Sequence, residues 1–105
     1  MFIAYEVSLD LIRSVRDLVP RIQRFDSDLA DQLKRAASSV TLNLAEGARL
    51  QAGNKRRHYD IAHGSANEVK GALDLVEAWG WSIDTTAARE LVDRQLGLLW
   101  GLTRP

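Results

Sequence analysis

The sequence contains no cysteine, which excludes disulfide bonds, thiolate chemistry and thiol-rich metal sites and is compatible with a cytoplasmic protein. It also has no excess charge, because 14 basic residues balance 14 acidic ones. Binding to nucleic acid or an anionic membrane would therefore need a local cluster of charge. The chain has no run of about 18 uncharged apolar residues that could span a bilayer, and its first residues lack the features of a secretory signal. We expect a soluble, cytoplasmic protein that does not associate with membranes.

Length and composition are those of one small globular domain. With 105 residues, of which 46% are hydrophobic, the chain can build one modest core and has no room for a second. We therefore expect a single domain over residues 1–105.

Apolar residues recur at helical spacing in the first half of the chain. The first helical pattern has Ser8 as a plausible N-cap. Pro20 lies inside it and predicts a kink or a break near Val19, after which the helix resumes. Residues Asp26–Asp28 can cap a second helix, and Gly47 can end it in a left-handed conformation. One face of this second helix is apolar and should face the core: Leu29, Leu33, Ala36, Ala37, Val40 and Leu44.

The second half of the chain continues in the same way. Asn54 can cap a third helix that ends at Gly80, and Asp84–Thr86 supplies the start of a fourth helix. We find no strand pattern and no repeat of solenoid length. Short loops favour antiparallel neighbours, so the sequence predicts an all-α fold, an antiparallel up-down-up-down four-helix bundle.

Polar side chains form a line along the second predicted helix and recur on the third. They are Arg35, Ser39, Asn43 and Glu46, with Ser65 and Glu68 on the third helix. Antiparallel pairing would bring Ser39 near Ala62 and Arg35 near Ser65, within reach of an ion pair with Glu68. The group is either a functional site or a link between two helices. Nothing in it resembles a nucleophile held by its base, so we favour the structural role.

A basic group surrounds the loop predicted at residues 48–53. Its members are Arg49, Lys55, Arg56, Arg57 and His58. Three of these cations fall in the first turn of a helix, where each costs about 0.3–1 kcal/mol against the helix dipole if exposed. Violations of local preference often mark a functional surface. The basic group has one of two roles: it contacts the phosphates of a nucleic acid, RNA or DNA, or it is a solvated surface. Because the group contains no aromatic residue on which bases could stack, we expect no sequence-specific recognition of single strands.

Three residues predict a contact between copies of the chain. Leu42 points away from both the apolar and the polar stripe of its helix, and would be exposed unless a second surface covers it. Gly64 and Gly71 each lower helix stability by about 1 kcal/mol relative to alanine. Close approach of another helix would explain both features, so we expect a homo-oligomer with Leu42, Gly64 and Gly71 at its interface.

The sequence predicts no catalytic site, no metal site and no cofactor. His58 and His63 would point about 140° apart on a helix, which does not suit a shared metal ion. The chain has no glycine-rich phosphate loop and no Ser-His-Asp pattern. We interpret Trp79, Trp81 and Trp100 as core and interface packing, not as a ligand cage.

Two segments resemble the paired signatures of a known family. They are residues 36–47, which contain Asn-Leu-Ala-Glu-Gly, and residues 61–68, which contain Gly-Ser-Ala-Asn-Glu. In the four-helix-bundle family known from open reading frames in 23S rRNA intervening sequences, a similar Asn-[Ile/Leu]-Ala-Glu-Gly segment closes the second helix and Gly-Ser-x-x-Glu lies in the third. The same family includes the accessory variability protein of diversity-generating retroelements. The resemblance covers roughly residues 6–85.

This resemblance implies an up-down bundle that assembles into a homopentameric barrel. It also implies nucleic-acid binding, the activity usually proposed for the family, and a reverse-transcriptase partner in the retroelement branch. It supplies no catalytic residue. The zero net charge and Pro20 are two features in which the chain departs from the expected pattern.

Two functions therefore compete. We favour a non-enzymatic, homo-oligomeric binding module that presents basic residues to nucleic acid or to a nucleic-acid enzyme. The alternative is a structural or protein-interaction bundle, whose protein partner binds the Leu42 side or the tryptophan end. Salt-dependent binding to nucleic acid would distinguish the first from the second.

Overall fold

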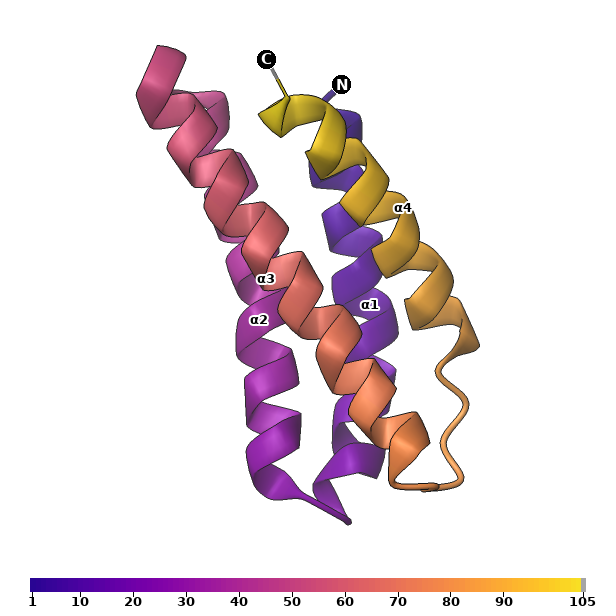
Figure 1. Cartoon of the computed structure of the whole chain (residues 1–105). Coiled ribbons are helices and arrows are strands. Elements are labelled where there is room, and N and C mark those ends of the chain that lie inside the picture. The colour runs from indigo at the N-terminus through magenta and orange to yellow at the C-terminus, as the bar shows by residue number, and fades with distance from the viewer. Residues whose placement is uncertain (105) are drawn as a thin grey trace.

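The computed structural model describes residues 1–104, which form four α-helices and no β-strand (Figure 1). The helices are α1 (Ile3–Gln23), α2 (Ser27–Ala48), α3 (Ala52–Ala78) and α4 (Thr86–Thr103). Helix α1 packs against α2 and α4, and α3 packs against the same two helices. The result is an elongated molecule of 43 × 21 × 21 Å with both chain ends at one of its tips. The predicted all-α, four-helix architecture is confirmed.

The core lies between the four helices and follows the apolar spacing of the sequence. The predicted apolar face of α2 is buried along its whole length, from Leu29 to Leu44. It belongs to one core cluster with fully buried residues of the other three helices, among them Leu11, Leu73 and Leu99. Short side chains are common in this core, which allows the helices to approach one another closely.

Several predicted helix ends are present, each with a recognisable cap. The Asp26 carboxylate accepts a hydrogen bond from the Leu29 backbone N–H at 3.0 Å and so caps α2. Gly80 follows α3 with a φ of +76°, a left-handed conformation that favours glycine. The Asp84 carboxylate accepts from the Thr86 N–H at 3.0 Å at the start of α4, and this bond lowers the pKa of Asp84.

The predicted start of the first helix was wrong. Helix α1 begins at Ile3, and Ser8 lies inside it, fully buried. The Ser8 hydroxyl donates to the Tyr5 carbonyl at 2.6 Å and accepts from the Thr41 hydroxyl of α2 at 2.9 Å. A serine that resembled a cap therefore joins two helices inside the bundle.

Two other boundaries also differ from the prediction. Helix α1 continues through Pro20 to Gln23, so the backbone does not break at Val19. Pro20 has no backbone N–H and so removes one hydrogen bond to the preceding turn, but the helix continues to Gln23, as the prediction that it resumes requires. Helix α3 begins at Ala52, before the expected cap at Asn54. Within residues 1–104 no helix has both the length and the apolar character required to cross a bilayer.

Candidate nucleic-acid interface

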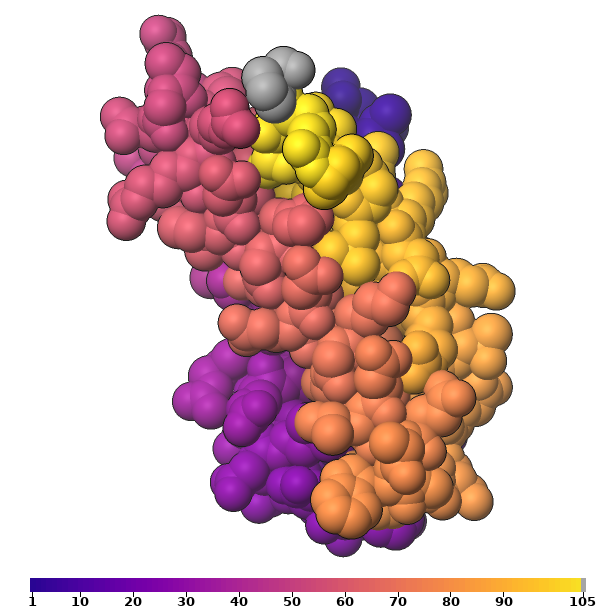
Figure 2. All heavy atoms as spheres, in the orientation of Figure 1, coloured from indigo at the N-terminus to yellow at the C-terminus, as the bar shows by residue number. Residues whose placement is uncertain are grey.

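The basic group lies where α2 ends and α3 begins, at the same tip as the chain ends (Figure 1). Arg49 is the C-cap residue of α2, and Lys55, Arg56 and Arg57 lie in the first two turns of α3. All four are exposed or half-exposed. The first turn of α3 contains no acidic residue to offset the positive end of the helix dipole. In Figure 2 this region projects beyond the rest of the bundle.

Only part of this basic group is free of carboxylate partners. Arg49 donates to the Glu46 carboxylate at 3.1 and 2.5 Å, and this hydrogen bonding lowers the pKa of Glu46. Lys55 lies 6.0 Å from the centre of the Tyr59 ring, at the outer limit of a cation–π contact. Over the described residues 1–104, Arg56 and Arg57 form no ion pair. They are the cations most available to a phosphate.

His58 faces inward, away from the role that its place in the basic group suggested. Its Nδ1 lies 3.0 Å from the Asn43 Oδ1. The Asn43 amide donates its Nδ2 to the carbonyl and the hydroxyl of Ser39, at 2.9 and 3.1 Å. The Asn43 oxygen is thus left as an acceptor, which requires the hydrogen on His58 to sit on Nδ1. His58 therefore links α3 to α2.

Ser65 completes a chain of hydrogen bonds between α2 and α3. The hydroxyls of Ser39 and Ser65 are 2.7 Å apart. Together with His58 and Asn43 they form a continuous polar ladder, the α2–α3 ladder, in the order Ser65, Ser39, Asn43 and His58. The Asn43–His58 contact is in the expected register, and Arg35 and Ser65 line one groove as predicted. The Ser39 hydroxyl, however, reaches Ser65, about one helical turn from the predicted neighbour Ala62.

The expected ion pair between Arg35 and Glu68 is absent from the single chain. Both residues line the same open groove between α2 and α3, which also contains Gln32 and Ser65. No nitrogen of Arg35 comes within ion-pair distance of Glu68 anywhere in residues 1–104. Glu46 likewise pairs with Arg49 and does not join the ladder. Arg35, Glu46 and Glu68 therefore flank the ladder without belonging to it.

Position 47 requires glycine for a reason that sequence analysis missed. Helix α2 continues to Ala48, so Gly47 is not the left-handed cap that was predicted. It is buried, and a Cβ atom added to it would lie 2.6 and 2.8 Å from two carbons of the Tyr59 ring. Tyr59 is itself buried, which raises the pKa of its hydroxyl. Glycine is required here because an aromatic ring of α3 rests directly on the α2 backbone.

The residues predicted at a contact between copies are open to solvent in the single chain. Leu42 is 68% exposed on α2. Apart from the adjoining backbone of α3, no atom lies within 4 Å of the position that a Cβ would occupy on Gly64 or Gly71. Gly71 also lines a second open groove between α2 and α3, together with Leu29 and Leu75. These positions are accessible to another chain.

The two histidines have separate partners. His63 lies 3.5 Å from the Asn67 amide and 6.4 Å from the Trp100 ring, whereas His58 contacts Asn43. In the part of the chain that the structure describes, no three histidine, aspartate or glutamate residues are grouped as metal ligands would be.

The three tryptophans, predicted to pack in the core and at interfaces, differ in burial in the single chain. Trp79 and Trp100 are 66% and 54% exposed, and only Trp81 is half-buried against the core. Both exposed rings have partners within the chain, Trp81 for Trp79 and Arg104 for Trp100, yet stay accessible to solvent.

Comparison with known protein families identifies a match over most of the chain. A family model described as 23S rRNA-intervening sequence protein matches residues 2–94, which covers all of α1, α2 and α3 and half of α4. None of the curated proteins compared with the chain matches it.

Proposed function

The chain belongs to the 23S rRNA-intervening sequence protein family, and we propose that it is a non-enzymatic, homo-oligomeric module that presents basic residues to nucleic acid or to a nucleic-acid enzyme. The observation that carries this proposal is the position of Lys55, Arg56 and Arg57. These cations project at the start of α3 without carboxylate partners in residues 1–104. Their cost against the helix dipole is offset if they meet phosphates.

We also infer an antiparallel up-down-up-down arrangement of the helices. Contacts of α3 with α2 and with α4 support it, because in each pair they run in opposite sequence directions. Ser39 meets Ser65 while the later Asn43 meets the earlier His58. In the same way Lys70 meets Asp93 while the later Asp74 meets the earlier Arg89.

Assembly would multiply the charge. In a ring, each copy adds its own cations to one surface, so weak contacts act together. The exposed Leu42 and the open Gly64 and Gly71 support an interface on α2 and α3. We expect five copies, the number that the family resemblance implies.

The polar residues between α2 and α3 support a binding module over an enzyme. Their side chains satisfy one another in the α2–α3 ladder. A catalytic site would need a nucleophile or base directed at a substrate. We therefore assign the ladder a structural role.

Two measurements test the proposal. Light scattering at micromolar concentration should give an oligomer, and a monomer would contradict the assembly. Fluorescence anisotropy should show binding of RNA or DNA at 50 mM salt that weakens steeply as salt is added. The double substitution Arg56→Ala with Arg57→Ala should lower the slope of log K against log salt by about 0.9 for each duplex phosphate that the two arginines neutralise.

Matched substitutions on α1 provide the control. Arg13→Ala with Arg16→Ala removes the same charge from arginines that already pair with carboxylates of their own helix, Asp10 and Asp17. This control should bind nearly as well as the unmodified protein. If both double variants lose the same affinity, binding depends on overall charge and not on this tip. If no nucleic acid binds at 50 mM salt, the protein-interaction bundle becomes the better explanation.

A further inference from the structure

Three aromatic rings form a stack at the tip opposite the basic group, where the α1–α2 turn meets the α3–α4 loop. The ring centres of Phe25 and Trp81 are 5.0 Å apart with 12° between their planes, and those of Trp79 and Trp81 are 6.3 Å apart with 11°. Trp81 pairs with both other rings and packs on the core. Phe25 and Trp79 are 56% and 66% exposed. The stack therefore leaves broad aromatic surfaces uncovered.

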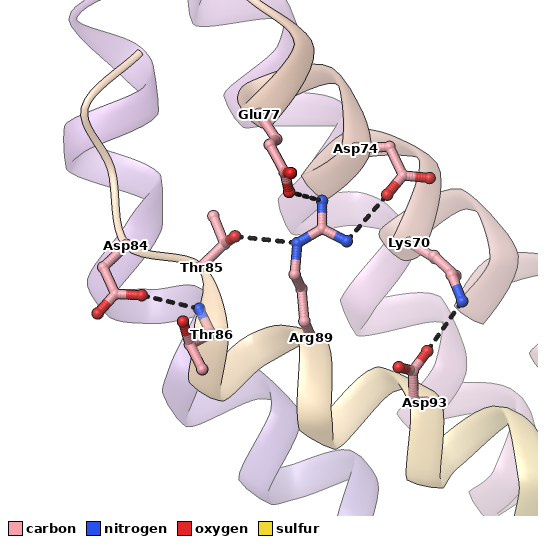
Figure 3. Close-up of polar contacts among 8 residues, drawn as sticks. All are labelled: Lys70, Asp74, Glu77, Asp84, Thr85, Thr86, Arg89 and Asp93. Carbon is pink, nitrogen blue, oxygen red and sulfur yellow. Dashed lines mark hydrogen bonds and ion pairs between the residues drawn. The ribbon is translucent and has the colours of Figure 1, made fainter. Parts of the chain in front are cut away.

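Acidic residues outnumber basic ones in the segments that form this tip. Residues 20–32 and 71–90 form this tip, here called the aromatic end, and contain seven acidic and three basic residues. Of the three basic residues, Arg89 is shared between Asp74 and Glu77, at 3.0 and 2.9 Å (Figure 3). One guanidinium thus offsets two carboxylates and leaves a net negative charge beside the tryptophans.

The opposite tip has the reverse balance. Residues 1–8, 42–60 and 98–104 contain five basic and three acidic residues. The zero net charge of the sequence therefore hides a separation of charge along the 43 Å length of the molecule. In Figure 2 the end of α3 lies at the lower end of the visible face, beside the purple α1–α2 segment and far from the basic loop.

We propose that the aromatic end binds an arginine-containing segment of a protein partner. A guanidinium group stacks flat on an indole ring and at the same time donates forked hydrogen bonds to carboxylates, so it fits both features of this surface. The chain itself contains such a stack at its other tip, where the Arg104 guanidinium carbon lies 3.1 Å from the centre of the Trp100 ring. The excess of carboxylates opposes binding of a polyanion here.

The test uses the full chain and a fluorescein-labelled peptide of four Arg-Gly repeats, with fluorescence anisotropy as the measurement. Trp79→Ala should weaken binding about fivefold or more, because it removes the most exposed ring of the stack. The control is Trp100→Ala, which removes a tryptophan of similar exposure from the other tip and should leave the affinity unchanged. Circular dichroism should show the same helix content in both variants.

Two further comparisons test whether binding depends on the carboxylates of the aromatic end and on the guanidinium group of the peptide. Glu77→Gln should weaken binding, whereas Glu6→Gln, the same change near the N-terminus, should not. A Lys-Gly peptide of equal length should bind several-fold more weakly, because an ammonium group lacks the planar fork.

Three outcomes would overturn the proposal. The first is equal affinity of the Trp79→Ala and Trp100→Ala variants for the arginine peptide. The second is self-association of the chain in the absence of peptide, if Trp79→Ala abolishes it. The aromatic end would then bind a second copy of the chain. The third is binding of a single-stranded oligonucleotide that depends on Trp79 in the same way.

Discussion

Helix α3 contacts α2 on one side and α4 on the other, and these two contacts are built from different chemistry. Towards α2 it presents Ser65 and His58, and the α2–α3 ladder joins the helices through hydrogen bonds without an ion pair. Towards α4 it presents long charged side chains, and Arg89 and Lys70 bridge the helices to carboxylates at the surface (Figure 3).

The two contacts differ in how far they allow one helix to shift along the other. Short side chains fix the register, because a hydroxyl or amide reaches only the group directly opposite. Long side chains can follow a partner that shifts, and in water their ion pairs contribute little free energy. The α2–α3 contact therefore specifies how the helices pair, whereas the α3–α4 ion pairs tolerate change.

The largest effect is expected at Gly47. Gly47→Ala places a methyl group against the buried Tyr59 ring and should lower the free energy of unfolding by about 1–3 kcal/mol. The control is Gly97→Ala on α4, where nothing lies within 4 Å of the added carbon, and which should raise stability by about 0.5–1 kcal/mol. Urea denaturation measures both.

A second substitution identifies the cause. In a Tyr59→Leu background, Gly47→Ala should cost much less, because the ring that it would strike is gone. If Gly47→Ala stabilises the unmodified chain as Gly97→Ala does, the close approach between α2 and the Tyr59 ring is not tight.

An intermediate effect is expected at Asn43. Asn43→Ala removes the central member of the ladder and should lower the free energy of unfolding by about 1–2 kcal/mol, since each neutral hydrogen bond contributes about 1 kcal/mol. Nitrogen NMR should also show that His58 no longer keeps its hydrogen mainly on Nδ1. The control is Asn67→Ala, which removes an exposed asparagine that contacts only His63 of its own helix. Equal losses in the two variants would mean that the ladder adds no stability.

Most of the fold could be predicted from sequence because apolar spacing and caps are local signals. The apolar face from Leu29 to Leu44, the Asp26 cap and the left-handed Gly80 all depend on neighbours a few residues away. Ser8 shows the limit of such signals, since its true partner is Thr41, on the next helix. A cap and a buried link between helices use the same residue types.

The candidate site was harder to predict because it depends on contacts between helices. The expected register places Asn43 opposite His58, as observed, but the Ser39 hydroxyl reaches Ser65, about one helical turn from the expected neighbour Ala62. Gly47 was predicted to cap its helix, and only the position of the Tyr59 ring, on the next helix, shows that glycine is needed there for a close contact. The members of the basic group could be named from sequence, but not the inward turn of His58.

The smallest effect is expected at the α3–α4 contact. Arg89→Met keeps the apolar stem of a side chain that is 28% exposed and removes both of its ion pairs. The loss in unfolding free energy should be about 0.5–1 kcal/mol, the upper range for ion pairs near the surface. Because salt screens exposed charges over about 3 Å at 1 M, most of this difference should vanish at that concentration. Arg13→Met, whose partner Asp10 lies on the same exposed helix face, should change stability still less. A loss at Arg89 that exceeds the loss at Asn43 and persists in 1 M salt would show that the α3–α4 ion pairs, and not the α2–α3 ladder, hold α3 in place.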